Sequence, residues 1–242
     1  MYERSQVQKD VYLLLEKVRA GQYTDAEQIL SSYSNAGDLL NHSFDDLRTP
    51  LGLAAAGTKD AEDMEWLILR GAEVNWRHDS HDSGLNINAL TIAIEEGNVA
   101  AVAKLLEYGA DITRSNPYKD SPLCVAIDAR TPNGTSTDQF DVDSQQIVRL
   151  LLEYGADPNS TDWAWSGKTA LHKAVQYFDS LQGFCLAGDL IPILLEAGAD
   201  PLMPDASGIT PLDICRLNKD TRSETLLMEA IAKRHKSDHE HS

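Results

Sequence analysis

The sequence predicts an all-α protein built from stacked helix-turn-helix units, because two short motifs recur along it. The first motif, Leu-Leu-Glu-x-Gly-Ala-Asp or a close variant, occupies residues 67–73, 105–111, 151–157 and 194–200. The second motif, of the type Thr-Pro-Leu-x-x-Ala, precedes each of these and recurs once near the end, at residues 49–54, 88–93, 121–126, 169–174 and 210–215. A motif pair that recurs about every 20 to 50 residues indicates a stack of similar structural units.

The apolar residues of each unit have helical spacing. In residues 88–111, one short segment carries Leu90, Ala93 and Ile94, and a second carries Leu105 and Leu106. The polar and glycine residues at 96–98 separate the two segments, which predicts two short helices joined by a turn. Neither helix can cover its own apolar face, so each helix pair depends on its neighbours in the stack.

Proline and glycine mark the expected ends of these helices. Proline lacks the amide hydrogen that a first helical turn does not use, and it occupies this position at Pro50, Pro122 and Pro211. A positive φ is often needed where a helix ends, and glycine adopts it freely. Glycine follows the second helix of each full unit, at Gly71, Gly109, Gly155 and Gly198.

Together these motifs resemble the ankyrin repeat, which contains Thr-Pro-Leu-His-x-Ala and has a period of about 33 residues. The opening motifs start at residues 49, 88, 121, 169 and 210, so one interval has the family's period and the others are longer. The resemblance implies an ankyrin-repeat solenoid with projecting hairpin loops. It implies one domain, 1–242, with a degenerate first unit (1–46), four repeats (49–87, 88–120, 121–168 and 169–209), a capping unit (210–236) and a tail (237–242).

The chain is strongly acidic, with 38 acidic residues, 21 basic residues and a formal net charge of −17. Because Lys and Arg provide most of the affinity for phosphates, this composition argues against a nucleic acid partner. Residues 61–200 contain 22 of the acidic residues and nine of the basic ones, which concentrates the charge in the central units. No signal-peptide core and no apolar run of about 18 residues is found, so we expect a cytoplasmic protein without a membrane partner.

The three cysteines are too few and too scattered to form a disulfide framework. We expect Cys124 and Cys215, both within opening motifs, to be buried, which leaves Cys185 as the candidate reactive thiol. His172 occupies the histidine position of the opening motif, and the resemblance implies that its imidazole hydrogen-bonds neighbouring turns. These expectations favour a protein without a catalytic residue, a cofactor or a small-molecule substrate.

Two longer insertions leave a catalytic alternative open. Asp138, Asp141 and Asp143 could offer oxygens to a cation, but they lack the glycine and the terminal glutamate of a calcium loop. We favour a flexible acidic loop that caps the following helix at Asp143 or Ser144, and we expect no metal. The alternative is an enzyme whose site lies in residues 129–144 and 177–190, although these insertions contain no histidine to act as a base.

Aromatic residues in the expected hairpins point to a binding surface. Exposed Trp and Tyr side chains are costly unless a partner covers them, and both are enriched in binding hot spots. Carboxylates lie near them in the sequence and on the first helices, which suits a basic partner. The predicted partner-binding residues are Trp76, Asp79, Asp82, Glu95, Glu96, Tyr118, Asp120, Asp128, Asp162, Trp163 and Trp165. In the alternative interpretation the tryptophans fold back onto neighbouring helices, as we expect for Trp66 at core spacing.

The resemblance and the charge together predict a non-catalytic protein–protein interaction module. We expect a monomer that inhibits or neutralises a basic partner protein, as an immunity-type protein does, through the first-helix and hairpin face. A secreted pathogen effector that binds host proteins would have the same features. An adaptor that joins two proteins is a further alternative, and it would present two separate apolar patches.

Overall fold

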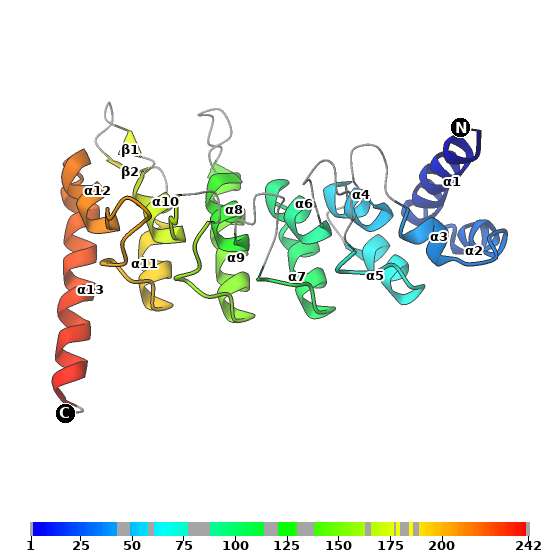
Figure 1. The fold of residues 1–242 in the computed structure, drawn as a ribbon. Helices are drawn as coiled ribbons and strands as arrows, with labels where there is room; N and C mark the ends of the chain where they lie inside the picture. The colour runs from blue at the N-terminus through cyan, green and yellow to red at the C-terminus, as the bar shows by residue number, and fades with distance from the viewer. Residues whose placement is uncertain are drawn as a thin grey trace. The chain divides into compact units, whose positions relative to one another are not determined.

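The computed structural model describes residues 2–42, 49–57, 61–76, 88–113, 121–129, 138–162, 166–176, 178–179, 184–185 and 189–240. Helices dominate these residues (Figure 1), so the predicted all-α, ankyrin-repeat fold class is confirmed. The contacts within the chain divide it into two compact units, Met1–Pro117 and Tyr118–Ser242, and we describe each unit by itself.

The N-terminal unit contains seven helices in its described residues. Helix α1 packs against α2, α3, α4 and α5, whereas α4 packs on α6, and α5 packs on α7. The stacked pairs are therefore α4 with α5 and α6 with α7, as Figure 1 shows. The helices are α1 (Tyr2–Arg19), α2 (Tyr23–Ser31), α3 (Gly37–Leu40), α4 (Pro50–Gly57), α5 (Glu62–Leu69), α6 (Ala89–Glu95) and α7 (Val99–Glu107).

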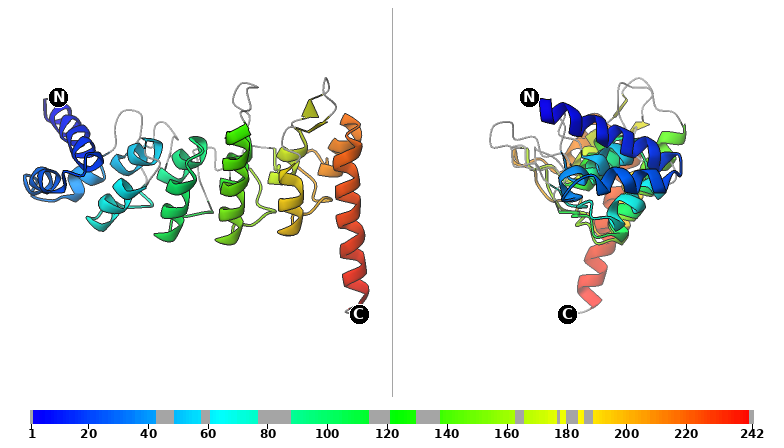
Figure 2. Two further views of the ribbon diagram at one scale, coloured as in Figure 1. Left: turned by 180° about the vertical axis from the view of Figure 1, so that it is seen from behind. Right: turned by 90° about the vertical axis from the view of Figure 1, so that its right-hand side faces the viewer.

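The C-terminal unit repeats this arrangement with three helix pairs. Helix α8 packs on α9 and α10, α10 packs on α11 and α12, and α13 packs on α11 and α12. The last helix runs on well past α12 (Figure 2). The elements are α8 (Pro122–Ala129), α9 (Asp138–Glu153), α10 (Ala170–Gln176), β1 (Phe178–Asp179), β2 (Phe184–Cys185), α11 (Leu190–Glu196), α12 (Pro211–Asn218) and α13 (Thr221–Glu240).

Most of the stacked helices are too short to be stable alone. Helices α4 to α8 have seven to nine residues, and isolated helices below about 12 residues are marginal in water. Their stability comes from burial between neighbours: residues 89–94 of α6 are all buried, as are residues 122–127 of α8. The predicted positive φ angles are found at Gly71, Gly109, Gly155 and Gly198.

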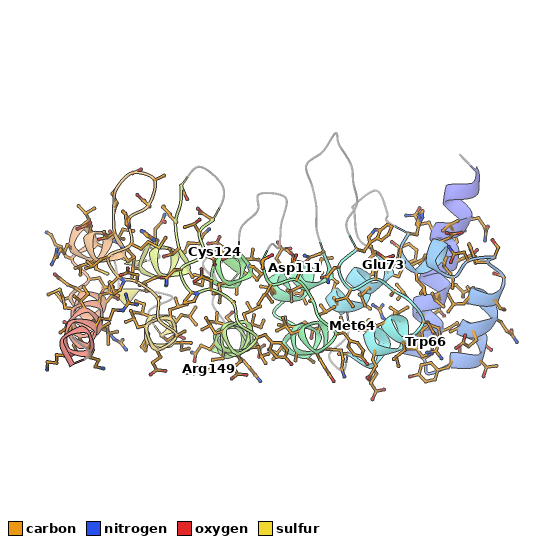
Figure 3. The ribbon with its side chains drawn as sticks, turned by 60° about the horizontal axis from the view of Figure 1, so that its bottom comes forward. Met64, Trp66, Glu73, Asp111, Cys124 and Arg149 are labelled. Carbon is orange, nitrogen blue, oxygen red and sulfur yellow. The ribbon has the colours of Figure 1, made fainter. Side chains whose placement is uncertain are left out.

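Within each compact unit, asparagine side chains connect one repeat to the next, through the loops that lead from one helix pair to the following pair. In each case the Nδ2 group donates to a glycine carbonyl of the next repeat, and the Oδ1 atom accepts the amide hydrogen of the residue two positions after that glycine. The donor–acceptor distances are 2.7 to 3.5 Å. Figure 3 shows Glu73 and Asp111 in two of these loops. The sets are Asn41 with Gly71 and Glu73, Asn75 with Gly109 and Asp111, and Asn159 with Gly198 and Asp200.

At the last helix pair, α12 with α13, an arginine takes the place of the asparagine. Arg234 of α13 donates from Nη2 to the carbonyl oxygens of Gly198 and Ala199, at 2.7 and 2.8 Å, and its Nη1 lies 3.1 Å from Asp200. A cation near the C-terminal end of α11 satisfies carbonyls that the helix itself leaves without a donor. Helix α13 thus contacts the end of α11 through Arg234, whereas the capping role of residues 210–236 stays a prediction.

One sequence prediction about the C-terminal unit is wrong. Helix α9 begins at Asp138 and not at Asp143 or Ser144, so residues 138–143 are helical rather than an acidic loop. Acidic residues are favourable in the first turns of a helix, which explains why the helix includes this segment. The helical backbone of α13 continues to Glu240, through part of the expected tail. The strands β1 and β2 form a short antiparallel pair in the second insertion.

Candidate functional site

Six of the eleven predicted partner-binding residues lie outside the described residues. These are Asp79, Asp82, Tyr118, Asp120, Trp163 and Trp165. The described ones lie in both units, with Trp76, Glu95 and Glu96 in the N-terminal unit and Asp128 and Asp162 in the C-terminal unit. We therefore examine the two groups separately.

The acidic pair of the N-terminal unit is exposed. Glu95 is the last residue of α6, and Glu96 follows it at the C-cap. The preceding six residues of α6 are buried, so this end is where the helix presents charge to solvent. Asn98 then caps α7 by accepting the Ala101 amide hydrogen at 3.1 Å, and its Nδ2 donates to the Ala55 carbonyl of α4. The turn that carries the two carboxylates is thus anchored to both neighbouring helices.

Trp76 stands at the start of the loop before α6. Its indole ring is half-buried, and the Nε1 atom is shielded from solvent without a hydrogen-bond partner among the described residues. The adjacent Asn75 is fixed by its bonds to Gly109 and Asp111, at 2.9 and 2.8 Å. The backbone at Trp76 is therefore anchored, while the ring is neither fully core nor fully exposed. Both interpretations of this tryptophan stay open.

The acidic residues of the C-terminal unit have a different environment. Lys173 of α10 lies 2.5 Å from Asp128 and 3.6 Å from Asp162, and its own side chain is 13% exposed. Asp162 is 7% exposed and accepts hydrogen bonds from the Ser166 hydroxyl at 2.6 Å and from the Lys168 amide at 2.9 Å. Asp162 therefore holds the loop that leads into α10, and we leave it out of the proposed surface.

His172 has the structural role that the resemblance implied. The ring is fully buried; its Nδ1 lies 3.1 Å from the Thr169 amide nitrogen, and its Nε2 lies 3.0 Å from the Ile209 carbonyl oxygen. These partners assign the hydrogen to Nε2, because Nδ1 must accept from the amide. Burial lowers the pKa of His172, although the bond to the Ile209 carbonyl opposes that shift. The histidine joins α10 to the segment before α12.

The described thiols are buried rather than reactive. Cys124 and Cys215 are both fully buried, as predicted. Burial is the main cause that raises the pKa of Cys124 to about 12, which keeps the thiol protonated at neutral pH. The side chain of Cys185 lies outside the described residues. Within the described part of the chain, no group of three His, Cys, Asp or Glu residues is arranged to hold a metal ion.

The second helices carry an aromatic cluster around Trp66. The sequence predicts that Trp66 is buried, but it does not predict the cluster. Trp66 is buried, as expected, and its ring stacks on Tyr23 with centroids 6.1 Å apart. The Arg70 guanidinium lies 3.9 Å from the Trp66 ring centroid and 2.5 Å from Glu27. This cluster joins α2 to α5, and Figure 3 shows Trp66 on α5. The i and i+4 spacing of Trp66 and Arg70 was the available sequence signal.

The repeat interpretation agrees with known proteins. A model of the family described as "Ankyrin repeats (3 copies)" matches residues 51–162. Regulatory protein NPR6 of Arabidopsis thaliana is 38% identical over 73 residues, which cover 30% of this chain and 14% of that protein. The BTB/POZ domain and ankyrin repeat-containing protein NBCL of Lotus japonicus is 37% identical with the same coverage. The match thus spans about one seventh of each plant protein.

A solved structure agrees over a larger part of the chain. An ankyrin repeat domain from Acinetobacter baumannii AYE matches with a TM-score of 0.67 and 25% identity, covering 90% of this chain and 97% of that domain. These matches support an ankyrin-repeat protein: the family model covers residues 51–162, and the solved domain shares the fold over most of the chain. Ankyrin repeats indicate a protein–protein interaction module, and the fold is in general a non-catalytic one. None of the described helices is long and apolar enough to cross a membrane.

Proposed function

We propose that this ankyrin-repeat chain is a non-catalytic binding protein that inhibits or neutralises a basic partner protein. The exposed carboxylate pair on α6, Glu95 and Glu96, is the observation that carries the proposal. These residues end a first helix, the helix class that faces partners in the family's concave surface. An acidic, anchored turn at this place suits a Lys- or Arg-rich protein surface.

The electrostatic environment supports this choice of site. Several basic residues of the central segment are held by local acids: Lys104 lies 3.5 Å from Glu65 and 3.1 Å from Glu107, and Lys173 lies between Asp128 and Asp162. Both lysines are therefore paired with nearby carboxylates. Within the N-terminal unit, residues 61–117 contain ten acidic and four basic residues, and this excess of negative charge would draw cationic partners at long range.

Aromatic contacts complete the proposed surface. Trp76 belongs to the loop that precedes α6, and its half-buried ring leaves part of its surface available for a partner. The proposal keeps Trp163, Trp165 and Tyr118 on the sequence argument alone. A carboxylate rim around aromatic anchors would steer the partner by charge and retain it by apolar contact.

Binding rather than catalysis is the proposed activity, and the environments of Cys124 and His172 support it. Cys124 is buried and protonated, and both ring nitrogens of His172 have partners. We further propose a cytoplasmic site of action, since the buried Cys124 is a free thiol, as a reducing compartment maintains. We propose a monomer as the acting form.

Affinity capture with charge-reversal variants tests the proposal. The double variant Glu95→Lys, Glu96→Lys should capture at least about tenfold less of the basic partner, which mass spectrometry would identify. The matched control is Glu153→Lys with Glu196→Lys, because these residues are also exposed and also end helices, but second helices. Equal losses in both double variants would show a general charge effect and contradict the site. Capture of acidic proteins by the unmodified chain would contradict the partner class.

A further inference from the structure

A surface cleft in the N-terminal unit lies apart from the acidic pair of α6. It has a volume of about 430 Å³, which is at the small end of ligand sites. One wall belongs to the second half of α1 and the other to α4. The lining residues are Tyr12, Leu15, Glu16, Arg19, Ala20 and Leu53.

Arg19 closes one side of the cleft and is already engaged. Its Nη2 donates to the Leu53 carbonyl oxygen at 3.2 Å, and its Nε lies 3.5 Å from the Asp63 carboxylate, whose side chain is 12% exposed. Gly57 makes room for this guanidinium, because a Cβ atom at that position would clash with Nη2. The positive charge of Arg19 is thus balanced within the protein and does not attract an anion to the cleft.

Glu16 gives the cleft its net charge. It is exposed on α1, one turn after Tyr12, whose side chain is 53% exposed, so both project along the same helical face. Leu15, which is 3% exposed, and the half-buried Leu53 supply an apolar floor. The cleft therefore offers a carboxylate, an aromatic ring and aliphatic carbon within one small volume.

We propose that this cleft binds an arginine side chain of a partner polypeptide. An arginine has an aliphatic stem that can lie on Leu15 and Leu53, and a planar guanidinium that stacks on an aromatic ring and pairs with a carboxylate. Tyr12 and Glu16 provide these two groups. The proposal rests on the proposed function only for the basic character of the partner, and it places a second contact outside the α6 surface.

Nuclear magnetic resonance titration of the full chain tests the proposal. The probes are the capped tripeptide acetyl-Gly-Arg-Gly-amide and its citrulline analogue, which has nearly the same shape without the charge. The arginine peptide should shift amide resonances of residues 12–20 and 50–57, and the citrulline peptide should bind at least about fivefold more weakly. Equal binding of the two peptides would overturn the proposal, as would shifts confined to the region of Glu95 and Glu96.

Single substitutions locate the contact. Glu16→Gln should lower the affinity for the arginine peptide about tenfold, because a charge-assisted hydrogen bond is lost. Glu62→Gln, which removes an exposed carboxylate of the same unit, should leave the affinity unchanged. Leu53→Lys should fill the cleft and weaken binding of the arginine peptide. If Glu16→Gln and Glu62→Gln behave alike, the cleft is not the site, whereas the capture test at α6 retains its own outcome.

Discussion

The acidic residues on the first helices of the two units have opposite environments. Glu95 and Glu96 end α6 in solvent, whereas Asp128 of α8 shares Lys173 with the buried Asp162. Each of these carboxylates contributes equally to the formal net charge of −17. The structure separates them by exposure, because Asp162 is buried and holds a loop whereas Glu95 and Glu96 are exposed. Net charge therefore indicates the kind of partner, and burial indicates which acids can meet it.

The largest expected difference between the two environments is in stability. Asp162→Ala should lower the free energy of unfolding by about 2–4 kcal/mol, because the Lys168 amide and the Ser166 hydroxyl lose their acceptor and Lys173 keeps only Asp128. Urea unfolding followed by circular dichroism would measure it. Glu96→Ala is the control and should change the value by less than about 0.5 kcal/mol. Equal effects would contradict the distinction.

A second difference is expected in the dependence of stability on pH. The pKa of His172 is lowered in the folded protein, so the unfolded chain binds the proton more readily. Stability should therefore fall as the pH drops through about 6.5, the usual histidine value. Thermal unfolding between about pH 7.5 and 5 would show this.

A variant without the histidine isolates this effect. His172→Gln should lose about 1–3 kcal/mol at pH 7.5 through its buried hydrogen bonds. It should also have a shallower pH dependence than the unmodified chain. An unchanged slope would assign the pH effect to other residues. The lowered pKa of Asp213, caused by hydrogen bonds from Thr210, acts only below about pH 4 and does not interfere.

The smallest effect has the opposite sign. Glu95→Gln with Glu96→Gln should raise the free energy of unfolding by about 0.3–1 kcal/mol, because negative charge at the C-terminal end of a helix opposes its dipole. The same urea experiment measures it. A loss of more than about 1 kcal/mol would mean that this pair has a structural role, like the acids around Lys173.

The repeat motifs were sufficient to predict the helix pairs, the glycines of positive φ and the roles of Trp66 and His172. Each of these depends on contacts that recur in every unit, so the local pattern contains the information. The start of α9 at Asp138 and the engagement of Asp162 were not predictable in this way. Both lie in segments that depart from the repeat, where the environment depends on residues distant in sequence, such as Lys173 for Asp162.

The cleft between α1 and α4 shows the same limit. The α1 residues that line it are spaced as one helical face, but the position of Leu53 beside them depends on the packing of two helices. Gly57 carries no sequence signal for its role, because the reason for a small residue there is the passage of Arg19. The division of 1–242 into repeats and caps stays a prediction, as do the binding residues outside the described segments.

The rate of association with the captured basic partner, measured at increasing salt, tests the central claim most directly. Exposed charges attract a partner over about 10 Å at 0.1 M salt and over much less at 1 M. We expect the unmodified chain to associate at least about tenfold more slowly at 0.5 M than at 0.05 M salt, and the Glu95→Gln, Glu96→Gln variant to show a clearly smaller decrease. The same salt dependence in both proteins would contradict the claim that this exposed pair recruits the partner.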